Sequence, residues 1–376
     1  MPKLKFINMA SLRSHLYFFI FFASLSVPSS STQSNSWSQK NQVALFIFGD
    51  SLFDAGNNND INNATGRANF WPYGETFFKY PTGRFSDGRI IPDFIAEYLN
   101  LPFISPYLQP SNDQYTNGVN FASAGAGALV ETYPGMVINL KTQLSYFKNV
   151  EKQLNQELGD KETKKLLSKA TYLIGIGSND YISAFATNST LLQHSKEYVG
   201  MVIGNLTIVL KEIYRNGGRK FGVVSLGSLG CIPALRAINK QINNSGGCME
   251  EVTVLAKSHN KALSKALEKL EKELKGFKYS YFDFYTSTND RANNPSKYGF
   301  KEGKEACCGS GPYKGILSCG RNAAIKEYEL CENPSEYLFF DSSHPTEKFN
   351  NQLAKLMWSG NPDITIPCNL KELCEA

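Results

Sequence analysis

Short apolar runs, separated by longer helical patterns, constrain the fold of this chain more than any other feature. Four such runs occur, "ALFIFG" at 44–49, "TYLIGIG" at 171–177, "KFGVVSLG" at 220–227 and "FKYSYFDF" at 277–284. Continuous apolar runs of this length predict strands that are buried on both faces. The segment "SEYLFFD" at 335–341 predicts a further, shorter strand.

The segments between these runs predict amphipathic helices over 141–158, 195–215 and 249–275. Their apolar residues recur at helical spacing: Leu144, Phe147, Val150, Leu154 and Leu158, then Tyr198, Met201, Val202, Leu206, Val209 and Ile213, then Leu255, Leu263, Leu267, Leu270 and Leu274. Gly159 is placed to end the first helix. Strands that alternate with such helices predict an α/β fold with a largely parallel sheet covered on both faces.

The first 30 residues differ in composition from the rest of the chain. Three basic residues, Lys3, Lys5 and Arg13, precede the apolar run "LYFFIFFASL", and the small, polar segment "SVPSSSTQS" follows it. This order predicts a cleaved secretory signal over 1–30 and a single domain over 31–376, since no linker or internal repeat divides the remainder. The alternative is a membrane anchor, but the run of about 10 residues is shorter than the roughly 20 that span a bilayer.

The charge balance gives no support to a nucleic-acid-binding function. The chain has 39 basic and 34 acidic residues, a formal charge of +5, and no basic block or aromatic-interleaved basic stripe that would mark a nucleic-acid groove. Loss of the predicted signal would leave a charge of about +2. A hydrophobic content of 42% is enough for a sizeable core.

All eight cysteines lie in the C-terminal half of the chain, at Cys231, Cys248, Cys307, Cys308, Cys319, Cys331, Cys368 and Cys374. An even number in a secreted chain favours disulfides, although the spacing does not choose a pairing. The alternative is a zinc site. No CxxC occurs and the four histidines are not at ligand spacing from the cysteines, so we expect no metal.

Four Asn-x-Ser/Thr triplets begin at Asn63, Asn188, Asn205 and Asn243 and predict N-glycosylation of a secreted protein. Asn205 is the least expected of the four, because it lies near the apolar side of a predicted helix. A glycan at this position would have to face solvent.

Four clusters of small and polar residues stand where a site would form in a parallel sheet, beyond the carboxyl ends of strands. They are "GDS" at 49–51, "NFASAGAG" at 120–127, "GSND" at 177–180 and "DSSHP" at 341–345. Ser51 alone is better explained as a turn or helix-cap residue than as a nucleophile, since a serine hydroxyl is a weak nucleophile without a base.

His344 is the best candidate for that base. His15 lies in the predicted signal, His194 lies in a polar connection, and His259 lies on an apolar helix side that predicts a hydrogen-bonded core histidine. Asp341, three residues before His344, could fix the imidazole tautomer and stabilise its protonated form. A surface cap would explain this pair as well. A helix is predicted from Pro345, with apolar positions at Phe349, Leu353, Leu356 and Met357.

The other clusters offer donors for a tetrahedral oxyanion. The backbone N–H groups of Ser51 and of a glycine near Gly125, with the side-chain amide of Asn179, could converge on it. Each cluster taken singly is also explained by tight-turn chemistry. Their combination favours an acyl-transfer site.

The ordered blocks resemble the GDSL family of SGNH hydrolases, in particular the plant secreted esterase/lipase branch. The blocks run from "FIFGDSLFDAGNNN" through "PYGETFF", "PTGRFSDGR", "GVNFASAGAGAL", "IGSNDY", "GGRKF" and "KEACCGSG" to "DSSHPTEK". No Gly-x-Ser-x-Gly motif of the α/β-hydrolase nucleophile elbow occurs. The resemblance implies a flavodoxin-like three-layer α/β/α sandwich that hydrolyses esters without a metal or organic cofactor.

The resemblance also implies roles for individual residues. Ser51 would be the nucleophile and an oxyanion donor, Gly125 and Asn179 the other donors, and His344 the base oriented by Asp341. Ala124 departs from the pattern, because many relatives have glycine there. Gly56 and the run 57–59 keep only a predicted turn or helix-end role.

The implied partner is a small-molecule or lipid ester. The implied location is outside the cell, in the apoplast or cell wall for a plant protein. Two alternatives remain open at this point: an acyltransferase that uses the same residues with an alcohol acceptor, and a non-catalytic binding or defence protein.

Overall fold

Five parallel strands and one antiparallel edge strand form the central sheet of this protein. The structure is a computed structural model that describes residues 43–64, 66–109, 115–187, 194–316, 319–320 and 328–375; the predicted signal and Asn188 lie outside these ranges. In spatial order the strands are β2 (Gly118–Asn120), β1 (Leu45–Gly49), β3 (Thr171–Gly175), β4 (Lys220–Val224), β5 (Lys278–Phe282) and β10 (Thr365–Ile366).

The order β2-β1-β3-β4-β5 is the flavodoxin-like order of doubly wound sheets. All pairs among these five strands are parallel, and only β10 runs antiparallel, against β5. The order reverses around β1, which lies between β2 and β3. In open α/β sheets ligands bind at such a point, beyond the carboxyl ends of the strands. The predicted α/β architecture with a mainly parallel sheet is therefore confirmed.

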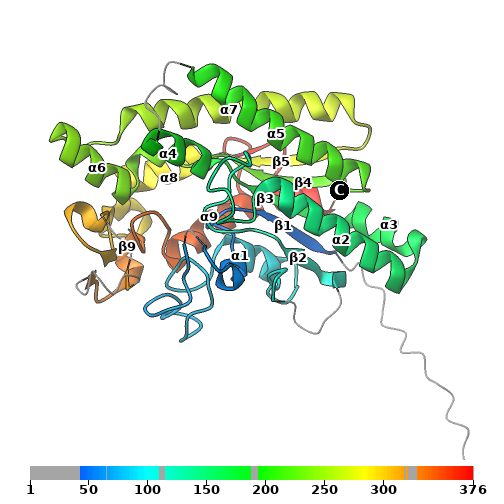
Figure 1. Cartoon of the computed structure of the whole chain (residues 1–376), viewed down its shortest axis with the longest axis horizontal. Helices are drawn as coiled ribbons and strands as arrows, with labels where there is room; N and C mark the ends of the chain where they lie inside the picture. Colours follow the sequence, from blue (N-terminus) through cyan, green and yellow to red (C-terminus); the bar gives the residue numbers. More distant parts are fainter. Residues whose placement is uncertain are drawn as a thin grey trace, which may run out of the picture. The chain divides into compact units, whose positions relative to one another are not determined.

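Helices cover both faces of the sheet. They are α1 (Ile91–Tyr98), α2 (Leu140–Leu158), α3 (Asp160–Lys169), α4 (Ser178–Thr187), α5 (Ser195–Arg215), α6 (Pro233–Asn243), α7 (Glu250–Glu273), α8 (Phe284–Asn293), α9 (Glu347–Ser359) and α10 (Leu370–Glu375). On one face α5 packs against α2 and α7, and on the other α9 packs against α1 and α10. Figure 1 shows α5 and α7 above the sheet and α1 below it.

The three helices predicted from periodicity, α2, α5 and α7, begin and end close to their predicted bounds. α2 begins after Asn139, whose side chain accepts a hydrogen bond from Thr142 N–H, and ends at Gly159, whose φ of 79° lies in the region that favours glycine. Two residues of the predicted apolar stripes are wrong as core positions. Leu158 in the last turn of α2 is 39% exposed, and Met201 on α5 is 53% exposed.

Aromatic rings stack across the sheet on the side of α2. Phe46 of β1 lies 5.5 Å from Tyr172 of β3, and Tyr172 lies 5.5 Å from Phe221 of β4, measured between ring centroids. Phe147 of α2 contacts the edge of Phe46 at 5.4 Å. Every residue of β1 and β3 is buried, so the strands that precede the candidate site are held rigidly.

Several short elements lie outside the predicted pattern. β2 and β10 have three and two residues and carry no apolar run. The segment 335–341 does form a strand, β9 (Tyr337–Phe339), but β9 pairs with β6 (Glu302–Ala306) in a separate two-stranded sheet. A second small sheet joins β7 (Cys308–Gly309) and β8 (Glu329–Leu330).

Two disulfides tie loops in the C-terminal half, Cys231–Cys248 and Cys307–Cys331. Cys308 and Cys319 are buried thiols, whereas Cys368 and Cys374 are half-buried thiols. The prediction that cysteines form disulfides is therefore confirmed for two pairs. In the part of the chain that the structure describes, no helix has the length and apolar character needed to cross a bilayer.

Candidate active site

Three of the predicted clusters meet at one edge of the sheet because their strands are neighbours. Gly49 at the end of β1 pairs with Gly175 at the end of β3, and Ile47 pairs with Asn120 at the end of β2. The loops that follow therefore leave the sheet side by side. They carry Ser51 and Asn179 to a common cavity.

Ser51, His344 and Asp341 form a continuous hydrogen-bond chain. Ser51 Oγ lies 2.7 Å from His344 Nε2, and His344 Nδ1 lies 2.7 Å from Asp341 Oδ1 and 2.8 Å from Oδ2. These residues are 293 positions apart at the widest, so the fold alone brings them together. The arrangement is that of a nucleophile, a base and an orienting carboxylate.

A tight turn after β9 presents Asp341 and His344 together. The N–H of Phe340 donates to the carbonyl of His344 at 2.7 Å, and the N–H of Thr346 donates to the carbonyl of Leu338 at 2.9 Å. Thr346 then caps α9 by accepting from Phe349 N–H, so this helix begins at Glu347 and not at the predicted Pro345. The turn thus places His344 beside the Asp341 carboxylate.

Hydrogen bonds keep the Asp341 carboxylate ionised. The side chain is 1% exposed, and this burial favours the neutral form. The charge of His344 and hydrogen bonds from His344, Tyr73 and Ser343 N–H more than offset the burial, so the pKa of Asp341 lies below its usual value. An ionised Asp341 can accept the Nδ1 proton of His344 and leave Nε2 free to accept from Ser51.

Two backbone N–H groups and one side-chain amide face the same cavity. Within the described residues the N–H groups of Ser51 and Gly125 have no hydrogen-bond partner, and both residues line the cavity. Asn179 also lines it; one of its amide protons bonds to the carbonyl of Ala126 at 3.0 Å, which leaves the second one available. These are the three donors that the sequence predicted for an oxyanion.

The substitution at Ala124 does not remove a donor. Ala124 N–H donates to Asp54 Oδ2 at 3.0 Å, whereas the donor that remains available belongs to Gly125. Gly125 has a φ of 85°, a conformation that favours glycine. The chain therefore retains glycine at the predicted donor position, Gly125.

Two buried carboxylates hold the loop on either side of Gly125. Asp54 accepts from Ala124 N–H before it, and Asp180 accepts from the N–H groups of Ala128 and Leu129 after it, at 2.9 and 3.1 Å. Asp54 also accepts from the N–H groups of Gly56 and Asn57, both at 2.7 Å. The loop that carries Gly125, here called the donor loop, is thus fixed to the segment that follows Ser51.

The asparagine run after Gly56 has a role beyond the predicted turn. It forms a single 3₁₀ turn, Asn57–Asp60, and its side chains reach the donor loop. Asn57 Nδ2 donates to the carbonyls of Asn120 and Ala122, and Asn58 Nδ2 donates to the carbonyl of Ala124 at 2.8 Å. Buried amides that satisfy these carbonyls set the distance between the Ser51 loop and the Gly125 loop.

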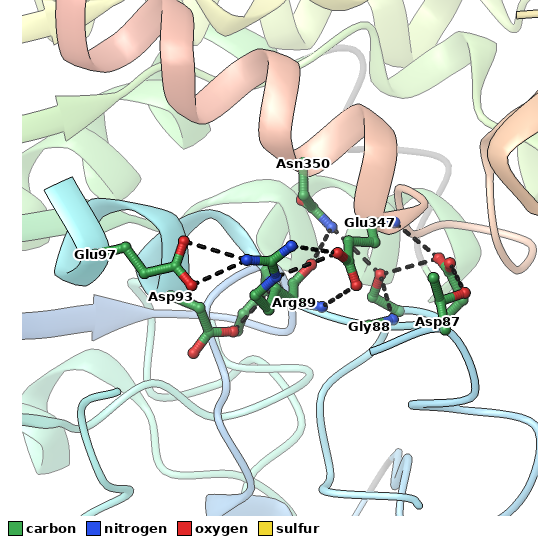
Figure 2. A network of polar contacts seen from close by, with 10 residues as sticks. Asp87, Gly88, Arg89, Asp93, Glu97, Glu347 and Asn350 are labelled. Carbon is green, nitrogen blue, oxygen red and sulfur yellow. Dashed lines mark hydrogen bonds and ion pairs between the residues drawn. The ribbon is translucent and has the colours of Figure 1, made fainter. Parts of the chain in front are cut away.

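The segment 70–90 forms the wall behind the Asp341–His344 pair. The Phe85 ring lies 4.8 Å from the His344 ring, centroid to centroid. Figure 2 shows how this segment is fastened to the start of α9: Asp87 accepts from Glu347 N–H at 2.7 Å, and the Glu347 carboxylate accepts from Arg89 at 2.7 Å. Arg89 also pairs with Glu97 of α1. The network fixes the helix that immediately follows His344.

A cavity of about 610 Å³ opens over Ser51. Its polar lining includes Ser51, Asn179 and His344, and the rest of its wall is largely apolar. The apolar lining residues include Leu52, Met136, Ile182, Leu229, Ile232, Phe284 and Phe339. Such a cavity, with a few converging polar groups, is typical of a site for a small apolar ligand.

Asp50, directly before the candidate nucleophile, is a buried carboxyl that titrates near neutral pH. Its side chain accepts from Leu52 N–H at 3.1 Å. Burial raises its pKa from 3.8 to about 7, and the Asp180 charge adds to this, against the opposing effects of the Leu52 hydrogen bond and His344. A raised native pKa means that the folded protein binds more protons than the unfolded chain between these two values.

We therefore expect the free energy of unfolding to fall as the pH rises from about 4 to 7, with Asp50 contributing up to about 4 kcal/mol of that fall. Asp50→Asn should reduce the slope. Urea unfolding of both proteins between pH 4 and 8 measures it. Equal slopes in the two proteins would contradict a raised pKa of Asp50.

The remaining histidines lie away from this chain of groups. His259 is fully buried and its Nδ1 is 2.8 Å from the Tyr181 hydroxyl, so its predicted role as a hydrogen-bonded core histidine is confirmed. His194 lies directly before α5. Across the described ranges, no three His, Cys, Asp or Glu side chains are grouped in a way that could hold a metal ion.

Comparison with known proteins places the chain in a family. The sheet order and helix layers are consistent with the SGNH hydrolase fold, which defines a class of hydrolases. The family model for GDSL-like Lipase/Acylhydrolase matches residues 45–357. The chain belongs to this GDSL family and is a carboxylic ester hydrolase.

Individual relatives are similar in sequence to this chain along most of their length. GDSL esterase/lipase 1 of Arabidopsis thaliana is 56% identical over 341 residues, covering 89% of this chain and 91% of that protein. A GDSL lipase of Tanacetum cinerariifolium is 53% identical over 339 residues, covering 90% and 89%. A third relative from Arabidopsis thaliana, 36% identical over 98% of this chain and 81% of its own length, is named an inactive GDSL esterase/lipase-like protein.

Proposed function

We propose that the protein is a secreted serine esterase or lipase that works through an acyl-enzyme on Ser51. The observation that carries this proposal is the unbroken chain from Ser51 Oγ through His344 to Asp341, with both links at 2.7 Å. Family membership alone does not carry it, because one relative is named inactive. A binding protein has no need of such a chain.

In the first half of the proposed reaction, Ser51 Oγ forms a bond to the ester carbonyl carbon while His344 Nε2 takes the hydroxyl proton. The negative charge that develops on the carbonyl oxygen is stabilised by the N–H groups of Ser51 and Gly125 and by the Asn179 amide. The bond to the alkoxy oxygen then breaks, and His344 donates its proton to the departing alcohol.

In the second half, a water molecule attacks the acyl carbon and His344 accepts a proton from it. The Ser51–acyl bond breaks, the proton returns to Ser51, and the carboxylic acid leaves. The apolar wall of the cavity supports an apolar acyl group as the part of the ester that it holds.

A fluorophosphonate probe tests the nucleophile directly. We expect a single covalent adduct, located on Ser51 by peptide mass spectrometry and absent from the Ser51→Ala variant. Ser287→Ala is a control for the loss of a serine hydroxyl away from the site, because Ser287 is buried and does not line the cavity. A folded protein that gives no Ser51-dependent adduct would favour a non-catalytic role. Adding simple alcohols during turnover, and measuring the ratio of new ester to acid, distinguishes water from an alcohol as the acceptor.

Asn179→Ala is expected to lower kcat by roughly 10²–10³ with a much smaller change in KM, since an oxyanion donor acts mainly in the transition state. Steady-state hydrolysis of an activated ester measures both constants. The melting temperature serves as the control for folding, because the lost bond to Ala126 is a single contact. Unaltered ester turnover would remove Asn179 from the proposed donors.

Secretion is supported by two kinds of observation. The two disulfides are typical of an oxidising compartment. Asn63, Asn205 and Asn243 are exposed, so glycans at these positions would face solvent, and this includes the position on α5 that the periodicity disfavoured. Mass spectrometry of the N-terminus and the asparagines of protein recovered from the medium tests both the signal and the glycans. An intact N-terminus in that material would contradict cleavage.

A further inference from the structure

We infer that Tyr73 is a positioning residue for the reaction, a fourth member of the hydrogen-bond chain that acts through Asp341. The inference rests on the proposed function of Ser51 and His344. The Tyr73 hydroxyl donates to Asp341 Oδ2 at 2.6 Å, on the side of the carboxylate away from the turn. The two residues are 268 positions apart in the sequence.

The hydrogen bonds to the carboxylate divide between its two oxygens. Oδ1 accepts from the N–H groups of Ser343 and His344, both at 2.8 Å, as part of the local turn. Tyr73 is the donor to Oδ2 that comes from elsewhere in the chain. Because a carboxyl group can rotate about its last bond, a donor on each oxygen fixes the plane in which His344 Nδ1 is held.

The surroundings of Tyr73 are built to hold the ring in one orientation. The side chain is 1% exposed, and its ring packs against Phe70, Phe85 and Phe340 at centroid distances of 5.3, 5.9 and 5.4 Å. Phe85 in turn packs on the His344 ring. The segment 70–85 therefore contacts both the orienting carboxylate and the base, and the hydroxyl is its only polar link to Asp341 among the described contacts.

The hydroxyl also changes the electrostatics of the pair. Its proton places partial positive charge against Asp341, which reduces the attraction of the carboxylate for a protonated imidazole. Other titratable groups that face the pair and Tyr73 are Asp50, which faces His344, Cys308, which faces Tyr73, and Cys319, which faces both Tyr73 and Asp341. Burial raises the pKa of Cys319, so this thiol stays neutral.

Tyr73→Phe removes the hydroxyl and keeps the packed ring. We expect kcat for an activated ester to fall roughly tenfold with KM nearly unchanged. We also expect a change in the pH profile of kcat/KM. The midpoint of its acidic limb, where kcat/KM falls with falling pH, should move up by about half a pH unit or more, because the protonated imidazole is held more strongly. The same comparison in an Asp50→Asn background removes the titration of Asp50 from the limb.

Tyr172→Phe is the matched control. Tyr172 is equally buried and its hydroxyl donates to the carbonyl of Leu167 at 3.0 Å, and neither residue lines the cavity. We expect this variant to lose stability without a change in kcat or in the acidic limb. A Tyr73→Phe protein with the kinetics and pH profile of the parent would overturn the inference, as would a loss of activity with no shift of the limb.

A double-mutant cycle separates a role through Asp341 from a direct one. In an Asp341→Asn background, Tyr73→Phe should change kcat/KM less than about twofold, since no carboxylate remains to orient. If Tyr73→Phe alone does not fold, the double variant should fold, because the amide carries no buried charge. Failure of both to fold would contradict the pairing. Failure of the proposed function is seen separately, as turnover that does not depend on Ser51.

Discussion

Ser51→Ala is expected to lower kcat for ester hydrolysis by a factor on the order of 10⁶, the size of loss seen when a nucleophile that acts as one unit with its base is removed. The physical reason is that no other described hydroxyl lies within hydrogen-bond distance of His344 Nε2. Folding should be unaffected, since Ser51 is half-buried and, among the described residues, its hydroxyl is hydrogen-bonded to His344 alone. Steady-state kinetics and thermal unfolding on one preparation measure both.

The double variant provides a check on this result, because the losses of activity from the two single changes should not add. Ser51→Ala combined with His344→Ala should be little worse than either change alone, because the base has no function without the nucleophile. Ser287→Ala should hydrolyse the ester at the parental rate. If the Ser51→Ala protein is folded and keeps more than about one hundredth of parental turnover, the acyl-enzyme on Ser51 is wrong.

Much of the sheet could be predicted because buried parallel strands are continuous apolar runs. β1, β3, β4 and β5 all coincide with such runs. β2 and β10 could not be found, since strands of three and two residues on the sheet edges leave no periodic pattern. β9 was predicted as a strand but lies outside the central sheet, because an apolar run does not specify its partner.

The candidate site could also be predicted only in part. Ser51, Asn179, Asp341 and His344 could be named from the sequence because each lies in a compact polar cluster near a strand end. Tyr73 carried no such signal, since one tyrosine in an aromatic segment is as well explained by packing. Its link to Asp341 is a contact across 268 positions that only the fold creates.

The donor in the second cluster shows a further limit of sequence reasoning. "FASAGAG" contains several small residues, and counting alone does not say which N–H is available. The answer depends on Asp54, whose carboxylate occupies Ala124 N–H and leaves Gly125 N–H without a partner among the described residues. Asp54 and the asparagines that follow it belong to a different loop, so their effect on Gly125 is invisible before the two loops are placed together.

Asp341→Asn is expected to lower kcat by about 10⁴ while the geometry of the turn is kept. The Asn oxygen can still accept from the N–H groups of Ser343 and His344. Its NH₂ group, however, would donate to His344 Nδ1 and force the proton onto Nε2. In that tautomer Nε2 cannot accept the Ser51 proton, and no carboxylate remains to stabilise the protonated imidazole. Steady-state kcat and the rate of fluorophosphonate labelling should fall together.

Asp290→Asn controls for the loss of an acidic charge, because Asp290 lies on α8 at the surface and pairs with Tyr298 and Lys297. We expect this variant to keep parental kcat. A folded Asp341→Asn protein with kcat within about tenfold of the parent would show that His344 finds its tautomer without the carboxylate. In that case the hydrogen bond from Tyr73 would lose its effect on the reaction as well, since among the described contacts the hydroxyl is linked to His344 through Asp341. Tyr73→Phe tests the contact between Tyr73 and Asp341, and Asp341→Asn tests the contact between Asp341 and His344. If both contacts orient His344, both variants must lower kcat.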